Sequence, residues 1–318
     1  MPAFPVAHIS FAVADEPTRK AWDSFLREVF AAETLYEVLM ADPEAQRLGL
    51  DRQQTLLAVG GTVLYAAAPA GPGLQADSVI GNMLRAHAQP HTWIGIALTV
   101  ADLEAARDWV RERGWTPRSY PLLEDRYFLL DRDETLGMRL EFLAHGLAND
   151  PRTRPGWSPA RWRDEHPLGL EGLQSIGVST VNLDLARQVY SEKLGWPEVA
   201  RRRTAAAECA SFHLGETVIE AMQPLDAASA LARHAHEKRG IWSLTFQVRS
   251  IDAAADYLRG RGLRLVEQHE HCFAIDPAQA FGRWLQFSDE IVEGCSPRDA
   301  VRPPPTDLAG LTGRDRLF

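Results

Sequence analysis

Apolar and polar residues alternate in four short segments of the chain, and each segment runs into an amphipathic helix pattern. A β-strand points successive side chains to opposite faces, so the alternation separates these residues into two sets. One set is large and apolar, and the other is small or polar. The apolar sets are Ile9, Phe11 and Val13; Ile96, Leu98 and Val100; Ile176 and Val178; and Leu244, Phe246 and Val248.

The opposite face of each predicted strand carries small or polar residues. We expect the helices to cover the apolar face and the small face to line a concave cavity, because only the apolar face gains from burial. The small or polar sets are His8, Ser10 and Ala12; Gly95, Ala97 and Thr99; Ser175, Gly177 and Ser179; and Ser243, Thr245 and Gln247.

Two of the four segments repeat closely. Residues 96–103 match 244–251, and the helix after each ends in Arg-x-Arg-Gly, at 111–114 and 259–262. The offset is 148 residues from Gly114 to Gly262 and 145 residues from Glu141 to Gln286. A repeat with so small a slip indicates duplicated structural units. Each unit is predicted to be a strand, a helix and about three further strands, in the order A-B-A′-B′.

The repeats divide the chain into two predicted halves. The first half, 1–147, contains modules 6–67 and 92–143, which are linked by the Pro- and Gly-rich residues 68–92. Residues 148–172 are the predicted linker, and the second half, 173–290, contains modules 174–222 and 241–287. Residues 291–318 include three consecutive prolines, so we expect an extended tail.

Composition and charge exclude several classes of function. The chain has 318 residues, 45% of them hydrophobic, and a formal net charge of −9. This charge argues against nucleic acid or an anionic membrane as a partner. No apolar run approaches the roughly 20 residues of a membrane-spanning helix. The three cysteines lack metal-type spacing, so we expect a cytoplasmic protein. Glycine-rich phosphate loops and hydrolase elbows are absent from the sequence.

With these residues in place, the chain resembles the vicinal oxygen chelate superfamily. That superfamily includes glyoxalase I, methylmalonyl-CoA epimerase, type I extradiol dioxygenases and bleomycin-resistance proteins. The resemblance covers all four modules and implies an α+β fold, in which four βαβββ modules form two tandem incomplete barrels, each around a cup. The superfamily runs unrelated reactions on this scaffold, so the resemblance alone does not give the reaction.

The resemblance also implies positions for a divalent metal in each cup. Family members bind it through the first residue of the first strand and a residue in the last strand of each module. His8, Glu141 and Glu220 keep the family's residue types, and the other five positions depart from them. The implied positions are His8, Tyr65, Gly95 and Glu141 in the first half, and Ser175, Glu220, Ser243 and Gln286 in the second.

Three first-half residues are the candidates for chemistry, and each has a structural alternative. His8 is a predicted ligand for zinc, nickel, iron or manganese, or else a strand-edge histidine bonded to backbone or water. Glu141 is a predicted ligand or general base, or else the ion-pair partner of Arg139 on the same strand face. Tyr65 is a predicted proton donor, or else a residue that only shapes the cavity.

The remaining positions offer few further ligands. Gly95 has no side chain, and His91 is about 13 Å along the same predicted strand face, so it could serve only if that strand starts differently. In the second half Glu220 and His213 make only two donors, fewer than the usual three. We therefore expect no metal in the second half.

Two functions remain open from the sequence. The first is a metal-dependent lyase or isomerase that chelates vicinal oxygens of a small substrate in the first-half cup, with Glu141 or Tyr65 moving the proton. The second is a metal-free protein that binds or sequesters a small molecule on the same scaffold. A homodimer is left open.

Overall fold

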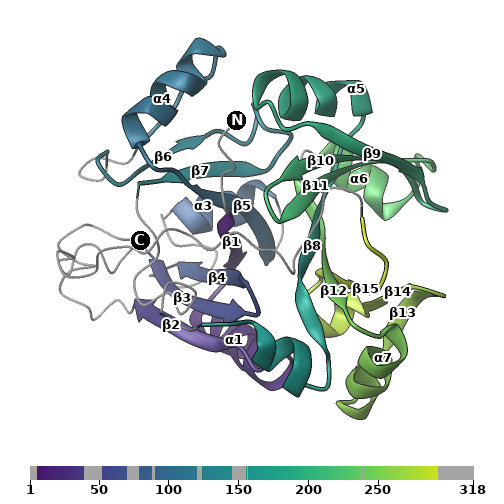
Figure 1. Cartoon of the computed structure of the whole chain (residues 1–318). Helices are drawn as coiled ribbons and strands as arrows, with labels where there is room; N and C mark the ends of the chain where they lie inside the picture. Colours follow the sequence, from purple (N-terminus) through teal and green to yellow (C-terminus); the bar gives the residue numbers. More distant parts are fainter. Residues whose placement is uncertain are drawn as a thin grey trace.

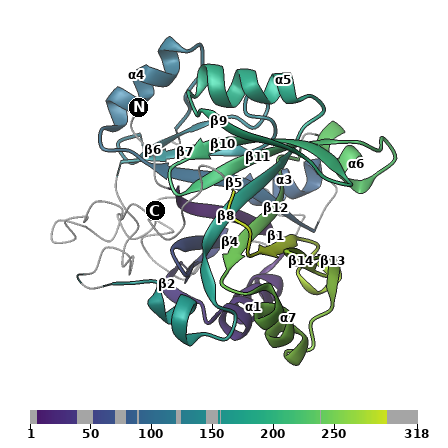
Figure 2. The same cartoon turned by 45° about the vertical axis from the view of Figure 1, so that its right-hand side comes forward.

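The computed structural model of the chain describes residues 6–38, 52–69, 79–87, 90–119, 124–144, 155, 157–237 and 239–292. Two mixed β-sheets, one of seven strands and one of eight, carry helices on their outer faces (Figures 1 and 2). Most of the predicted tail, and the first part of the predicted linker, lie outside the described residues. In the described segments no helix has the length and apolar character needed to cross a membrane.

The first sheet has the strand order β2-β3-β4-β1-β5-β7-β6. Its elements follow the chain in two modules. They are β1 (Val6–Val13), α1 (Glu16–Phe30), β2 (Glu33–Val38), β3 (Arg52–Val59), β4 (Thr62–Pro69) and α3 (Val79–Ala86), then β5 (His91–Thr99), α4 (Leu103–Glu112), β6 (Tyr127–Leu130) and β7 (Arg139–Leu143).

The second sheet has the order β13-β14-β15-β12-β8-β11-β10-β9. A single π-helical turn, Arg161–Glu165, precedes it. Its elements are β8 (Leu170–Ser179), α5 (Leu183–Ala186) continued by a π-helical stretch (Arg187–Lys193), β9 (Glu198–Arg203), β10 (Ala207–Leu214), β11 (Thr217–Pro224) and α6 (Ala230–His236), then β12 (Ile241–Val248), α7 (Ile251–Gly260), β13 (Leu265–His269), β14 (Cys272–Ile275), a 3₁₀ turn (Pro277–Gln279) and β15 (Trp284–Ser288).

Within each half the two modules join through their first strands. β1 pairs with β5 and β8 pairs with β12, both antiparallel, while each first strand pairs in parallel with the last strand of its own module. The modules therefore lie edge to edge in one sheet, and the curl of that sheet forms the cup. The predicted α+β fold of two tandem incomplete barrels is confirmed.

The same capping chemistry starts the main helix in all four modules. Asp15, Asp102, Asn182 and Ser250 each follow the end of a first strand by two or three residues and accept a hydrogen bond from a backbone N–H in the first helical turn. Such caps satisfy donors that the helix itself leaves free. The sequence thus turns each strand sharply into its helix, and the helix packs on the apolar face of the sheet.

Two elements differ from the sequence prediction. The second module was expected to have three strands after its helix. In the described residues the first of these three is reduced to one bridge between Arg118 and Leu129. Pro117, beside Arg118, has no N–H to donate and so limits the ladder. The link at 68–92 also contains a helix, α3, which buries Ile80 and Leu84.

One continuous apolar core connects the two halves. Phe30, at the end of α1, is buried with its ring centre 5.6 Å from Phe246 and 6.1 Å from Phe287, both in the second sheet. The linker residue Trp162 is buried and donates from Nε1 to the Phe30 carbonyl at 2.9 Å. Tyr257 of α7 donates to the Val29 carbonyl at 3.0 Å, and Figure 2 shows α1 and α7 side by side.

The shared core predicts that the halves unfold together. Phe30→Ala should lower the free energy of unfolding by about 3–5 kcal/mol, because it removes a buried ring that bridges both sheets. Urea denaturation followed by fluorescence and by circular dichroism measures this loss. Val181→Ala, at an exposed position, is the control. Two separate transitions, with only the first shifted by Phe30→Ala, would contradict a shared core.

Three histidines lie among arginines near the contact between the halves. Burial, reinforced by the Arg132 guanidinium, lowers the pKa of His87 to about 4. Burial and Arg283 lower the pKa of His91 to about 4. For His234, burial and the same arginines lower the pKa to about 3, and its Nδ1 lies 2.7 Å from the Ser179 hydroxyl. All three rings are therefore neutral in the folded protein at neutral pH.

These histidines predict a loss of stability in mild acid. Unfolded histidines have an ordinary pKa near 6.5, so below that pH the unfolded chain binds protons that the folded chain does not. Stability should be full above pH 6.5 and should fall as the pH drops toward 4. The urea midpoint at pH 7 and pH 5 measures the effect. His234→Asn should weaken the pH dependence and His236→Asn, at an exposed position, should not; equal slopes in both variants would refute the assignment.

Candidate active site

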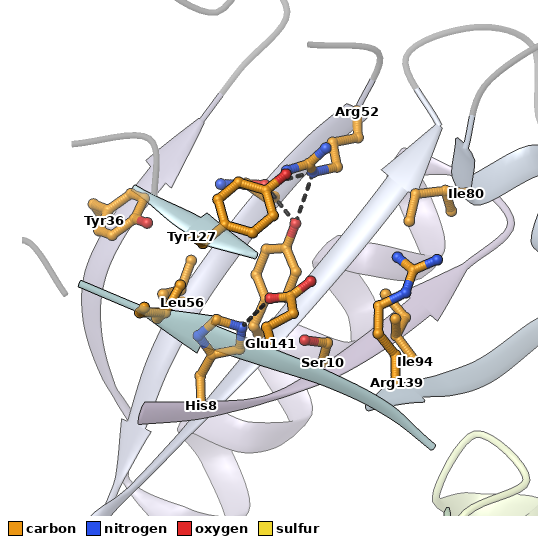
Figure 3. Close-up of a pocket in the computed structure, with 13 residues that line it drawn as sticks. His8, Ser10, Tyr36, Arg52, Leu56, Ile80, Ile94, Tyr127, Arg139 and Glu141 are labelled. Carbon is orange, nitrogen blue, oxygen red and sulfur yellow. Dashed lines mark hydrogen bonds and ion pairs between the residues drawn. The ribbon is translucent and has the colours of Figure 1, made fainter. Parts of the chain in front are cut away.

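A cavity that is partly open to solvent lies in the first half (Figure 3), and its empty space, open solvent included, is about 600 Å³. Its walls come from the seven strands of the first sheet and from α3, and they combine apolar and aromatic side chains with a few polar ones. The lining residues are His8, Ser10, Tyr36, Arg52, Gln54, Leu56, Tyr65, Ile80, Ile94, Tyr127, Arg139, Glu141 and Leu143.

His8 and Glu141 approach each other in this cavity. The strand register places both beside Ala97, His8 from β1 and Glu141 from β7, so they flank one small side chain. His8 Nε2 lies 3.6 Å from Glu141 Oε2, and the side chains are 9% and 21% exposed. The methyl group of Ala97 leaves room for this contact across two strand spacings. The structure therefore brings together the two residues that the sequence proposed as metal ligands.

Burial and charge act in opposite directions on Glu141. Burial by itself would raise the pKa of the carboxyl group. The neighbouring His8 and the guanidinium groups of Arg139 and Arg52 outweigh burial, so the pKa of Glu141 lies below its ordinary value. Glu141 is thus a carboxylate at neutral pH, which is the form that a metal ligand or a general base requires.

Tyr65 lies beside this pair and is held by two further side chains. Its ring centre is 5.3 Å from that of His8. Its hydroxyl accepts a hydrogen bond from Arg52 Nε at 2.9 Å and donates to Gln54. The structure therefore gives Tyr65 a fixed hydroxyl in the same cavity as Glu141.

Sequence reasoning missed Arg52 and Gln54. Both stand on β3 with period-two spacing, in Arg52, Gln54 and Leu56, which was the available signal. Arg139 was considered only as a partner for Glu141. In the described residues Glu141 has His8 as its ion-pair partner, while Arg139 acts on it only at longer range.

A β-bulge at Ile94 determines which side chains of β5, the first strand of the second module, face the cup. Ser10 pairs with Gly95 but Phe11 pairs with Trp93, so Ile94 is the extra residue and its side chain lines the cavity. A β-carbon on Gly95 would lie 1.9 Å from the Arg139 carbonyl oxygen, so only glycine fits there. This family ligand position therefore supplies no donor.

The same bulge corrects the placement of His91. An extra residue inverts the alternation, so His91 does not share the cup face with the Gly95 position. Its ring centre lies 6.2 Å from that of Phe11, and its Nε2 is near Gly282 of the second half. His91 thus lies at the contact between the halves and not in the cup.

The second half has the same register with different side chains. Ser10 pairs with Tyr65 and Gly95, and Gly177 likewise pairs with Glu220 and Ser243. The predicted equivalence of the two halves is confirmed at these positions. The Glu220 carboxylate receives two hydrogen bonds from Arg202, from Nε at 2.7 Å and from Nη2 at 3.0 Å. Arg202 therefore already satisfies the carboxylate of the second cup.

The described residues only partly suit a divalent metal in the first cup. Both ring nitrogens of His8 are buried and have no hydrogen-bond partner, and Glu141 is ionised beside them. However, the Tyr65 hydroxyl is occupied by Arg52 and Gln54, and Gly95 offers nothing. In the described part of the chain no group of three or more His, Cys, Asp or Glu side chains could hold an ion. Two donors fall short of the usual three.

The comparisons with known proteins agree with the fold. The model of the Glyoxalase/Bleomycin resistance protein/Dioxygenase superfamily matches residues 172–273. The resemblance to the vicinal oxygen chelate superfamily, which the repeats indicated, is therefore confirmed. No curated protein sequence matches the chain.

Solved structures extend the likeness to the whole chain. A triple mutant of 4-hydroxymandelate synthase from Streptomyces coelicolor is 14% identical, with a TM-score of 0.65, over 95% of this chain and 99% of that one. Methylmalonyl-CoA epimerase from Mycobacterium tuberculosis is 26% identical over 37% of this chain and 87% of that one, with a TM-score of 0.35. At this identity the synthase shows a shared fold and no more.

The two-donor arrangement predicts weak metal binding. Protein purified without chelator should lose zinc, nickel, iron and manganese on gel filtration, because His8 and Glu141 alone hold an ion poorly. Elemental analysis of wild-type, His8→Ala and Ser175→Ala protein measures this. One tightly bound ion per chain, lost in His8→Ala and kept in Ser175→Ala, would contradict this prediction and support the metal site that the resemblance implied.

Proposed function

We propose that the first-half cup is the active site of an enzyme that moves a proton next to a carbonyl group of a small molecule. The reaction is then an isomerase or lyase step. The observation that carries this proposal is the ionised Glu141 carboxylate, which lies beside His8 in a cavity that is partly open to solvent.

In this proposal Glu141 takes the proton from the carbon, and the carbon–hydrogen bonding electrons move toward the carbonyl oxygen. Tyr65 turns its hydroxyl proton from Gln54 to that oxygen and gives it up, which yields an enol. Arg52, which donates to the Tyr65 oxygen at 2.9 Å, then stabilises the phenolate that is left. Glu141 returns its proton to a different carbon or face while the enol hydroxyl gives its proton back to Tyr65, so the carbonyl re-forms and an isomerisation is complete. In a lyase reaction the proton of Glu141 goes instead to a leaving group that departs from the neighbouring carbon, with the same return of a proton to Tyr65. No step requires a metal.

The superfamily supports an enzyme in general terms, since its name includes a glyoxalase and a dioxygenase. The second candidate function is a metal-free binding protein. One specific observation favours it, because several of the described walls of the cup are apolar or aromatic.

Hydrogen–deuterium exchange separates the two functions. Small 2-oxo acids are incubated with the full chain in D₂O, and exchange of the hydrogens next to the carbonyl group is followed by NMR. Glu141→Gln should slow enzyme-dependent exchange by roughly 10²–10⁴-fold, because it removes the base but keeps the shape. Ser175→Ala, at the second-half position that matches His8, should leave the rate unchanged.

The outcomes are distinct. Wild-type exchange that persists in Glu141→Gln contradicts the assigned base. Ligands that bind in the cup without any exchange leave the binding protein as the function.

A further inference from the structure

Arg139 is a partly buried cation, and one of its nitrogens is buried without a hydrogen-bond partner. It lies on β7 two residues before Glu141, so both side chains rise from the same face of the strand (Figure 3). Its side chain lines the cavity, and the unpartnered nitrogen is Nε. Buried polar groups in proteins nearly always have partners, so this nitrogen needs an explanation, and a bound anion would supply one.

The charges around Arg139 favour an anion. Arg52 and Arg139 bring two positive charges to the described cavity wall, and Glu141 brings one negative charge. A third guanidinium is close, because burial and then Arg139 lower the pKa of Arg132 to about 10. One further negative charge in the cavity would balance the net charge of Arg52, Arg139 and Glu141 on its wall.

We propose that the substrate of this site is a small organic carboxylate, which Arg139 binds by its carboxylate group. This inference rests on the proposed function and names its substrate class. The carboxylate lies on the Arg139 side of the cavity, and the adjoining carbon then lies toward Glu141. The apolar part of the molecule packs on Ile80 and Ile94, which adjoin Arg139 in Figure 3.

A carboxylate fits this place better than a phosphate ester. The planar guanidinium can donate two parallel hydrogen bonds to a carboxylate, and a single negative charge matches the single excess positive charge of the wall. A dianionic phosphate would leave excess negative charge beside Glu141. The walls are otherwise apolar or aromatic, which suits a carboxylate on a hydrocarbon or aromatic body.

The second half shows that this arginine is particular to the first cup. Arg139 pairs with Gly95, and in the same register Trp284 pairs with Ser243. The second cup thus has tryptophan where the first has arginine. The arginine that reaches the second cup, Arg202, pairs with Glu220. Duplication of the scaffold does not explain Arg139, and anion binding does.

Calorimetric titration with three phenyl compounds, two of them of equal shape, tests the inference. Phenylacetate carries the carboxylate, phenylacetamide replaces it by a neutral amide, and phenyl phosphate carries a dianion. Wild-type full chain should bind phenylacetate at least about tenfold more tightly than either of the others. Arg139→Gln should abolish the preference over the amide. Arg111→Gln, an exposed arginine paired with Asp108 on α4, should keep it.

Each result supports or overturns the proposal. Equal binding of phenylacetate and phenylacetamide by the wild type overturns it, even if Arg139→Gln does not fold. A preference that survives in Arg139→Gln, or a stronger preference for phenyl phosphate, also overturns it.

The proposed function fails separately from this inference. Glu141→Gln should keep or strengthen phenylacetate binding, because it removes a negative charge. Carboxylate selectivity through Arg139 without any proton exchange sustains the inference and overturns the enzyme. Proton exchange that depends on Glu141, in a protein that binds phenylacetate no better than phenylacetamide, sustains the enzyme and overturns this inference.

Discussion

The antiparallel pairing of β1 with β5 is the interaction on which the first cup depends. It joins two modules that could not each bury a sheet alone, and it sets the register that places His8 and Glu141 on either side of Ala97. A slip of one residue would move His8 to the helix-covered face. The bulge at Ile94 belongs to the same pairing, and it fixes which side chains face the cavity.

The two halves share this framework and differ in how they satisfy charge. In the second cup Arg202 binds the Glu220 carboxylate through two hydrogen bonds, so the buried charge has its counter-ion within the protein. In the first cup Tyr65 stands at the matching position, and Arg52 binds its hydroxyl instead. The negative charge of Glu141 is therefore stabilised by His8 and, at longer range, by the guanidinium groups. Among the described residues, Glu220 thus has an arginine that donates two hydrogen bonds to it, whereas the near partner of Glu141 is His8.

Electrostatics also explains why the metal and anion interpretations of the first cup differ. A divalent cation gains from Glu141 and His8 but loses from the neighbouring Arg52 and Arg139. An organic anion gains from the two arginines and leaves the carboxylate free to act as a base. The polar residues on the cup wall thus favour an anionic ligand more than a cation held by protein donors.

The sequence by itself determined the fold and half of the site. Four alternating segments with matching offsets specified four modules and the face that each strand turns to the cup, because period-two alternation is a local property. The resemblance to the superfamily then pointed to His8, Tyr65 and Glu141 on that face. Only the tertiary structure decided that Ile94 forms a bulge, that His91 lies between the halves, and that Arg52, Gln54 and Arg139 converge on one cavity. These features depend on strand register and sheet curvature, which arise from contacts between segments far apart in the chain and leave no periodic signal within any one of them.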